Sequence, residues 1–478
     1  MNLHLQGTLV CLERPLMTHL SIQPNEVFDA LQRHILVDGF HLVMDLEKSH
    51  GSWIVDARDG KKYLDFYTFF ATAPLGHSHP KLNTPEFRAH LGAIALHKPA
   101  NSDIYTTDYA EWVETFATHA APDYLPHLFW IDGGSLAVEN ALKAAFDWKV
   151  RKNLAKGKDE KGSKVIHFKE AFHGRTGYTM SLTNTADPRK HQYFPKFDWP
   201  RIPNPKLTFP LTAENLAQVE TAEREAVRAI EAVVALDPDD IACLIIEPIQ
   251  GEGGDNHFRS EFLMELRRLA DEHEFLLIFD EVQSGFGATG KWWAHQHFNV
   301  QPDIIAFGKK TQACGIAAGP RLDEVDSVFK VPSRINSTWG GNLVDMVRGT
   351  RIIEIIVEEQ LLDHCAKQGE RLLKGLQEIA ADFPEFTSNP RGKGLFCALD
   401  MATPELRNQI VSRSHDLGMM ILSSGTHGLR FRPALNLNTE DLDLGVELLR
   451  RGVADVVGNL SASRIGTADT ETTAHSLV

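Results

Sequence analysis

Residues 275–283 read Phe275-Leu-Leu-Ile-Phe279-Asp280-Glu-Val-Gln283, an uninterrupted apolar run that ends at a carboxylate. A short run without polar residues is typical of a strand that is covered on both faces, as in the parallel sheets of α/β proteins. Burying a carboxylate is costly unless it has a partner, so an acid at this point needs an explanation. The sequence therefore predicts a buried strand that brings Asp280 to the edge of a sheet.

The same pattern recurs elsewhere in the middle of the chain. Amphipathic stretches predicted to be helical separate the apolar runs, and this alternation is typical of a large α/β domain with a mainly parallel sheet. The other predicted strands are residues 127–131, 164–168, 241–246 and 303–307, and the predicted helices between them include 137–150 and 261–272.

Both flanks of this domain indicate smaller, mixed structure. A helical pattern starts at Asn25, and a hairpin turns at Arg58-Asp-Gly60. Residues 459–478 are rich in Ser, Thr, Ala and Asp, so we expect them to be disordered. The other predicted elements are strands 51–57, 61–65, 394–399 and 429–432, and helices 343–361, 362–383 and 439–457.

The composition is ordinary for a water-soluble globular protein and excludes several functional classes. Of the 478 residues, 43% are hydrophobic and 24% are charged. The formal net charge of −15 would repel nucleic acid and anionic membranes. There is no secretory signal pattern and no apolar run long enough to span a bilayer. Because the five cysteines are widely spaced, a reducing compartment is expected, and we predict a cytoplasmic location.

Each predicted strand of the large domain leads into glycine or polar residues. In open parallel sheets, ligands bind beyond the carboxyl ends of the strands, so these segments should converge on one crevice. The segments are Asp132-Gly133-Gly134-Ser135, Phe172-His173-Gly174-Arg175, Glu247-Pro-Ile-Gln-Gly-Glu252, Asp280-Glu-Val-Gln283 and Gly308-Lys309-Lys310.

Each of these segments also has a purely structural interpretation. A glycine loop that opens a helix suits a phosphate, but Ser135 could equally be an ordinary helix cap. Asp280 could be a cap or half of a structural ion pair. Burial would make a lysine after residues 303–307 nucleophilic toward carbonyls, yet a lysine can also extend to solvent. Spacing alone does not say whether Lys309 or Lys310 faces inward.

A metal site is not predicted. Asp280-Glu281 lacks a histidine at supporting spacing, and His77-Ser-His79 before a proline is more often a loop.

Taken together, the five segments resemble the class III, fold-type I aminotransferases, which depend on pyridoxal 5′-phosphate (PLP). The resemblance covers about residues 25–455. It implies a large domain with a mainly parallel seven-stranded sheet and a smaller α+β domain formed by both termini. The implied boundaries are an N-terminal extension 1–24, small-domain segments 25–85 and 345–458, a PLP-binding domain 86–344 and the tail 459–478.

Further motifs are similar to those of one subgroup, the L-lysine 6-aminotransferases. Many class III members have a glycine-rich tract after the lysine, whereas this chain has Lys310-Thr-Gln-Ala-Cys-Gly315, as the subgroup does. The subgroup's motifs are matched by Asn101-Ser-Asp, Phe197-Asp-Trp-Pro-Arg-Ile202, Gly308-Lys-Lys-Thr-Gln312, Asn336-Ser-Thr-Trp-Gly-Gly-Asn342 and Arg430-Phe-Arg-Pro.

The resemblance implies how the cofactor is held. Lys309 would carry PLP as a Schiff base and then move the substrate proton, and Asp280 would face the pyridine nitrogen. Ser337 and Thr338 would reach the phosphate of a neighbouring subunit, which implies a homodimer. The other implied cofactor contacts are Gly134 and Ser135 at the phosphate, Phe172 and Val282 on the two ring faces, and His173 and Gln283 beside the ring.

The resemblance also implies a substrate pair, L-lysine and 2-oxoglutarate. Transfer of the terminal amine would give 2-aminoadipate 6-semialdehyde, which cyclises to 1-piperideine-6-carboxylate, together with L-glutamate. Glu252 would pair with Arg430 while lysine is bound and release it to the α-carboxylate of 2-oxoglutarate. Arg175 would hold the far carboxylate of either substrate, with Asn336 and Gln283 nearby. Without the resemblance, Glu252 and Arg430 could be a plain surface ion pair.

Three alternative functions remain open at this stage. The nearest is a class III aminotransferase for ornithine, acetylornithine or 4-aminobutyrate. The second is a PLP-dependent racemase, mutase or decarboxylase, which would need no 2-oxo acid. The third is a catalytically silent protein with a binding or regulatory role.

Overall fold

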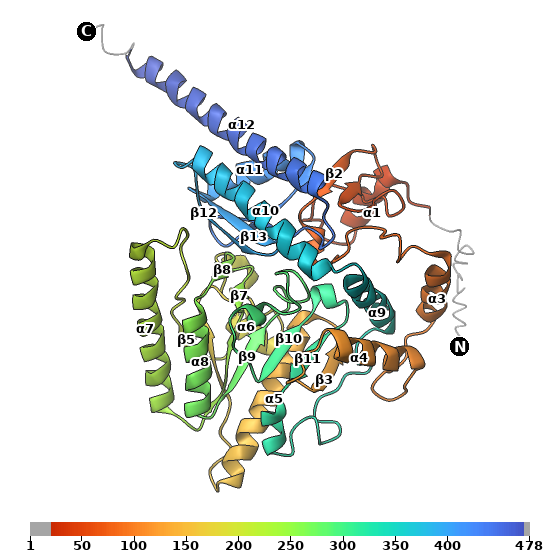
Figure 1. Cartoon of the computed structure of the whole chain (residues 1–478), viewed down its shortest axis with the longest axis vertical. Coiled ribbons are helices and arrows are strands. Elements are labelled where there is room, and N and C mark those ends of the chain that lie inside the picture. The colour runs from red at the N-terminus through yellow and green to blue at the C-terminus, as the bar shows by residue number, and fades with distance from the viewer. Residues whose placement is uncertain (1–20, 473–478) are drawn as a thin grey trace, which may run out of the picture.

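The computed structural model describes the backbone of residues 21–472 and the side chains of residues 21–459. At its centre lies a seven-stranded sheet with the strand order β3-β11-β10-β9-β6-β4-β5 (Figure 1). β11 is antiparallel to both of its neighbours, and every other pairing in this sheet is parallel. The strands are β3 (His127–Ile131), β4 (Lys164–Phe168), β5 (Arg201–Ile202), β6 (Ile241–Ile246), β9 (Leu276–Asp280), β10 (Ile304–Phe307) and β11 (Cys314–Ala318).

Alternate residues of the central strands bury opposite faces of this sheet. On β9, Leu276 and Ile278 belong to the apolar cluster that includes residues of α5 (Gly134–Ala155). Leu277 and Phe279 belong to the cluster on the other face, with residues of α8 (Ser260–Glu272). Each such side chain contributes roughly 1.5–3 kcal/mol by burial, and a one-residue slip would exchange the two faces. The register of the strands, and hence the position of their carboxyl ends, is therefore fixed by packing.

Several helices packed around this sheet begin at a capping side chain. The side chain of Thr106 accepts a hydrogen bond from the backbone N–H of Tyr109 at the start of α4 (Thr107–His119). Asn342 does the same for Val344 at the start of α9 (Leu343–Glu358). These bonds satisfy backbone groups that a helix leaves free at its N-terminus. The remaining helices here are α2 (Thr68–Ala71), α3 (Pro85–Ala95), α6 (Gly177–Leu182) and α7 (Ala213–Leu236).

The smaller α+β part is built from both ends of the described chain (Figure 1). β2 (Lys62–Asp65) pairs with β1 (Trp53–Val55) on one side and, in parallel, with β14 (Met419–Met420) on the other. This sheet therefore joins segments more than 350 residues apart in the sequence. The other elements are α1 (Val27–Gln32), the sheet β12-β13-β16-β15 (Thr387–Lys393, Phe396–Met401, Gly428–Phe431, Leu422–Ser424), and helices α10 (Leu361–Asp382), α11 (Pro404–Asp416) and α12 (Thr439–Thr472).

The structure differs from the sequence-based expectation at the end of the chain. α12 continues to Thr472, whereas the sequence predicted its end near residue 457 and disorder over 459–478. An α-helix satisfies its hydrogen bonds locally, so it can extend beyond the packed body without an apolar face to bury. Figure 1 shows the end of α12 projecting away from the rest of the molecule. Residues 1–20 and 473–478 lie outside the described residues, and so does most of the predicted extension 1–24.

Among the described residues, no helix combines the length and the apolar character that crossing a bilayer would require.

Candidate active site

The carboxyl ends of the central strands surround a cavity of about 470 Å³. All five polar segments singled out in the sequence contribute to it, because they follow β3, β4, β6, β9 and β10. The prediction that these strand ends converge is therefore correct. The lining residues are Phe70, Gly134, Ser135, Phe172, His173, Gly174, Arg175, Lys190, Glu247, Glu252, Asp280, Val282, Gln283 and Lys309.

Asp280 is the last residue of β9 and is almost completely buried at the cavity floor. Its Oδ2 lies 2.8 Å from Nδ1 of His173, and its Oδ1 accepts a hydrogen bond from the backbone N–H of Val282 at 3.0 Å. The Nε2 of His173 is buried and has no partner among the described residues. The carboxylate is thus fixed in position while still facing the cavity.

The two adjacent lysines after β10 point in different directions. Lys309 lines the cavity, and its Nζ lies 5.9 Å from the ring centroid of Phe70. Burial lowers the pKa of Lys309, and the nearby charge of Arg430 lowers it further. Lys310 is buried outside the lining and donates to the backbone carbonyl of Gln283 at 3.2 Å. The structure therefore separates the two lysines, which spacing alone left ambiguous.

Lys309 has a left-handed backbone with φ 57°. Such a conformation costs about 1–2 kcal/mol for a residue other than glycine and is often found at functional sites.

The loop between β3 and α5 forms a backbone cradle. Gly133 has φ 99°, and no side chain caps the first turn of α5. A Cβ on Gly134 would lie 2.8 Å from Cγ1 of Val282, so a larger residue would intrude on the cavity. Free N–H groups at a helix N-terminus together with the positive end of the helix dipole suit an anion such as phosphate.

Two threonines that the sequence did not single out extend this cradle. The Oγ of Ser135 lies 2.7 Å from Oγ1 of Thr176 and 2.8 Å from Oγ1 of Thr179. Hydroxyls from α5 and from the start of α6 therefore meet beside the free helix end. No sequence spacing indicated this, because the two helices belong to different strand–helix units.

Glu247 connects two of the loops around the cavity. One carboxylate oxygen accepts from the backbone N–H of Phe172, and the other accepts from that of Gly251, both at 2.9 Å. Burial raises the pKa of Glu247 to about 7. This residue holds together the loops that carry Phe172 and Glu252. Its position directly after an apolar strand was the available signal, although no separate role was predicted for it.

Glu252 and Arg430 form an ion pair inside the cavity wall, with Oε2 of Glu252 2.7 Å from Nη2 of Arg430. The Arg430 side chain is only 3% exposed, so this is not a surface pair. The other oxygen of Glu252 contacts Nζ of Lys190, a residue that sequence reasoning missed. Burial opposes ionisation of Glu252, but the charges of Arg430 and Lys190 outweigh it and lower its pKa.

Phe70 enters the cavity from a strained turn. Thr68, Phe69, Phe70 and Ala71 all have positive φ, between 44° and 67°. The Phe70 ring centroid lies 5.6 Å from Cζ of Arg430 and is also near Lys309, as noted above. Four consecutive left-handed residues without glycine have no sequence signature, so Phe70 could not be predicted.

The remaining predicted substrate and cofactor residues differ in whether they reach the cavity. Arg175 is exposed at the cavity mouth and forms no ion pair within residues 21–459. Gln283 is held by Arg432, whose Nη2 donates to its Oε1 at 3.0 Å. Asn336, Ser337 and Thr338 do not line the cavity of their own chain, and Ser337 instead accepts a hydrogen bond from Ser102 through its backbone carbonyl.

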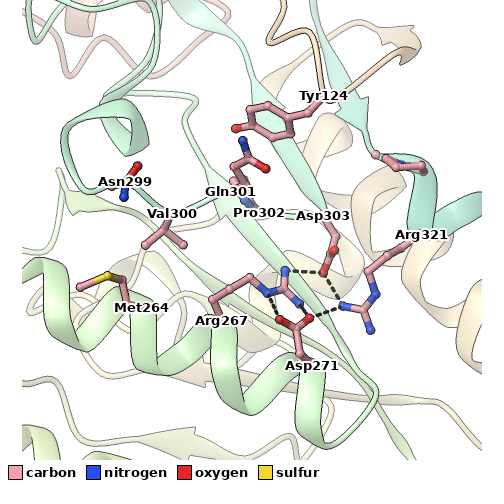
Figure 2. A pocket seen from close by; sticks show the side chains of 12 residues that line it. Tyr124, Met264, Arg267, Asp271, Asn299, Val300, Gln301, Pro302, Asp303 and Arg321 are labelled. Carbon is pink, nitrogen blue, oxygen red and sulfur yellow. Dashed lines mark hydrogen bonds and ion pairs between the residues drawn. The ribbon is translucent and has the colours of Figure 1, made fainter.

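A second cavity, of about 500 Å³, lies at the amino ends of β9 and β10. Figure 2 shows that two arginines, Arg267 and Arg321, both reach Asp303 there. Their distances to Oδ2 of Asp303 are 2.9 and 3.0 Å, and both also contact Asp271. The four charges therefore pair with one another and connect α8 to the segments that flank β10 and β11.

The family model described as Aminotransferase class-III matches residues 37–453 of the chain. The chain belongs to the class III aminotransferases. This aminotransferase is 50% identical over 430 residues to the L-lysine-epsilon aminotransferase of Mycobacterium tuberculosis H37Rv, covering 89% of this chain and 95% of that protein. It is also 50% identical over 433 residues to the L-lysine-epsilon aminotransferase of Amycolatopsis lactamdurans, covering 90% and 96%.

A solved structure of lysine aminotransferase from M. tuberculosis superposes on this aminotransferase with a TM-score of 0.89 at 49% identity. The match covers 91% of this chain and all of that one. The fold class, with its mostly parallel seven-stranded sheet, is therefore confirmed as fold-type I.

Class III aminotransferases use PLP, and the cavity of this aminotransferase is chemically suited to that cofactor. The free N-terminus of α5 suits the phosphate, and the buried carboxylate of Asp280 suits a protonated ring nitrogen. Lys309 supplies an amine with a lowered pKa in the same cavity. These three groups match the three ends of the cofactor.

Proposed function

We propose that this protein transfers the terminal amino group of L-lysine to 2-oxoglutarate, giving 2-aminoadipate 6-semialdehyde and L-glutamate. The observation that carries the proposal is the buried Glu252–Arg430 pair beside Lys309. A transaminase that accepts two chemically unlike substrates in one cavity needs an arginine that can be neutralised for one and exposed for the other. The similarity to L-lysine-epsilon aminotransferases supports this choice of donor.

The cofactor supplies an electron sink for the bond that breaks at the substrate carbon. Asp280 keeps a proton on the ring nitrogen by offering a fixed negative charge. Lys309 would hold the cofactor through its side-chain amine, and the free amine would take the proton from the reacting substrate carbon as a base and return it as an acid to the cofactor carbon on the other side of the shared nitrogen. Gly134 and Ser135 would hold the phosphate, Phe172 and Val282 would pack on the two faces of the ring, and His173 and Gln283 would lie beside it.

The donor half-reaction needs the positive charge of Arg430 to be hidden. The terminal carbon of lysine bears no carboxylate, so a free arginine beside it would be an unpaired buried cation. Glu252 removes that cost by pairing with Arg430. Arg175, which forms no other ion pair within residues 21–459, then holds the carboxylate at the far end of lysine.

The acceptor half-reaction needs the same arginine exposed. The reacting carbon of 2-oxoglutarate carries a carboxylate, which Arg430 binds in a bidentate manner after Glu252 moves away. Arg175 takes the distal carboxylate. A racemase or decarboxylase would have no use for a 2-oxo acid, so a requirement for 2-oxoglutarate would separate this proposal from those alternatives.

The proposal extends to assembly, domain boundaries and location. Since Ser337 and Thr338 lie outside their own chain's cavity, we assign them to the phosphate of a second subunit, with Asn336 near its substrate, in a homodimer. The proposed division remains 25–85 and 345–458 for the small domain and 86–344 for the large one. We propose a cytoplasmic location on the reducing character of the cysteine pattern.

The test is incubation of the purified protein with PLP, L-lysine and 2-oxoglutarate. We expect equal amounts of L-glutamate and a cyclised six-carbon imine, and no product when the 2-oxo acid is omitted. Single-turnover spectra with ornithine, acetylornithine and 4-aminobutyrate provide the comparison. Faster turnover of any of these amines than of lysine would rule out the proposed donor.

A further inference from the structure

We propose that Lys190 is a specificity-determining positioning residue: it is the second cation of Glu252 and holds that carboxylate when Arg430 binds an acceptor. The inference rests on the proposed function and assigns a residue that this function leaves without a role. It concerns only the free energy of moving Glu252 away from Arg430.

Glu252 is bracketed by two cations, one on each carboxylate oxygen. Oε2 lies 2.7 Å from Nη2 of Arg430, and Oε1 contacts Nζ of Lys190. Lys190 and Glu252 line the same cavity as Lys309. The carboxylate therefore does not depend on Arg430 alone for its counter-charge.

The two cations differ in freedom. The side chain of Arg430 is 3% exposed and lies on β16, so it is fixed, whereas that of Lys190 is 31% exposed and can follow a moving partner. Glu252 itself is 17% exposed. Lys190 is the more exposed of the two cations, so its side chain can stay with Glu252 when the carboxylate leaves Arg430.

The backbone of Lys190 is anchored even though its side chain is long. Lys190 ends the 3-10 turn Pro188–Lys190, where Asp187 accepts a hydrogen bond from the backbone N–H of Arg189. Upstream, the side chain of Asn184 donates to the carbonyl of Phe168 at the end of β4. The Lys190 amine therefore reaches Glu252 from the segment after β4, which also carries Phe172 and Arg175.

This arrangement has a direct energetic consequence. A partly buried carboxylate without a partner is costly, so Glu252 would resist leaving Arg430 if Lys190 were absent. With Lys190 present, Glu252 keeps one of its two ion pairs when it leaves Arg430. Lys190 therefore favours acceptors that carry a carboxylate on the reacting carbon and has little effect on a donor that leaves the Glu252–Arg430 pair intact.

The test uses the PLP-loaded enzyme with Lys190→Met, which keeps the length of the chain and removes its charge, and Lys190→Arg, which restores the charge. Lys196→Met is the matched control, because Lys196 is exposed on the same segment and does not line the cavity. For Lys190→Met we expect the KM for 2-oxoglutarate to rise about tenfold, the effect of one such charge pair, with KM for lysine and kcat little changed. Lys190→Arg should recover most of the loss.

A binding measurement separates this inference from the identity of the donor. Calorimetric titration of 2-oxoglutarate onto the enzyme in its aldehyde form measures binding without turnover, because this form has no amino group to transfer. Lys190→Met should raise the dissociation constant by the same factor. Titration with 4-oxobutanoate, whose reacting carbon bears no carboxylate, should give equal constants for both proteins. Equally weaker binding of 2-oxoglutarate, 4-oxobutanoate and lysine would mean that Lys190 binds the substrates themselves. No change in any of these constants would mean that Lys190 has no role in binding. Either result overturns the inference, whereas loss of lysine turnover in the wild type would overturn only the proposed donor.

Discussion

Contacts with His173 and Val282 orient the Asp280 carboxylate before any substrate binds. Nδ1 of His173 and the backbone N–H of Val282 each occupy one oxygen of the carboxylate, so its orientation is set by protein contacts. A preoriented charge costs no reorganisation during the reaction, which is why such groups account for large rate effects.

Replacement of Asp280 by Asn should therefore lower turnover more than binding. The amide keeps the size of the side chain but loses the charge that holds a proton on the cofactor ring. We expect kcat to fall on the order of a thousandfold while PLP remains bound. Stopped-flow kinetics with the absorbance of bound PLP as the control would measure both, and an unchanged kcat would remove the electron-sink role of Asp280.

Replacement of Glu252 by Gln tests the role of its negative charge beside Arg430. The variant leaves Arg430 as a buried cation beside the uncharged terminal carbon of lysine, which typically costs 2–5 kcal/mol. We expect the half-reaction with lysine to slow by about a hundredfold or more and the half-reaction with glutamate to be affected less. Single-turnover measurements of each half-reaction would show this difference, and equal losses would count against the exchange of partners at Arg430.

At the scale of elements, the sequence predicted the strands whose ends carry the candidate site residues. It missed several strands that contribute no such residue. Strands 127–131, 164–168 and 241–246 are correct to the residue, because uninterrupted apolar runs are unambiguous when both faces are buried. β11 was missed because Cys314-Gly-Ile-Ala-Ala is short and small, and β5 because Arg201–Ile202 is an edge strand of two residues.

The candidate site was predictable where it follows a strand and unpredictable elsewhere. Asp280 directly follows an apolar run, so its position could be read from the sequence, whereas the choice of Lys309 over Lys310 and the role of Glu252 came from the resemblance. Phe70 and Lys190 reach the same cavity from a strained turn and a 3-10 turn, which no periodicity reports. Tertiary folding, not local pattern, brings them in.

His167 on β4 should make the fold sensitive to acid. Burial, with Arg201 nearby, lowers its pKa to about 3, against about 6.5 in the unfolded chain. Between these values the unfolded state binds more protons, so this contribution to stability is complete above pH 6.5 and is lost as the pH falls toward 3. The loss amounts to about 1.4 kcal/mol per pH unit within that window.

The measurement is denaturant unfolding of the wild type and of His167→Gln between pH 7 and pH 4. The variant should show a shallower decrease in the free energy of unfolding, because its side chain does not titrate. His97→Gln, at an exposed position, is the control and should follow the wild type. Parallel curves for the wild type and His167→Gln would disprove a buried neutral histidine at this position.

At the scale of the whole molecule, the site is incomplete within one chain if Ser337 and Thr338 act across a subunit boundary. This can be tested by mixing defects, since a dimer with two-fold symmetry places Lys309 of one chain with Thr338 of the other. Lys309→Ala and Thr338→Asp should each be inactive alone, the second because its charge repels the phosphate.

Co-expression of these two variants should restore activity. In a mixed dimer, one site receives both defects and the other receives neither, so random pairing predicts about a quarter of the wild-type activity. Steady-state assays of the co-expressed and separately purified variants would compare the two situations. Failure to exceed the sum of the separate activities would place Thr338 outside the neighbouring site.

The account depends above all on which amine carries the cofactor. Borohydride reduction of the PLP-loaded protein, followed by digestion and tandem mass spectrometry, reads this directly. We predict a cofactor-derived mass on Lys309 and an unmodified Lys310 in the same peptide. A label on Lys310, on a different peptide or nowhere in the chain would contradict the assignment of this cavity as the active site.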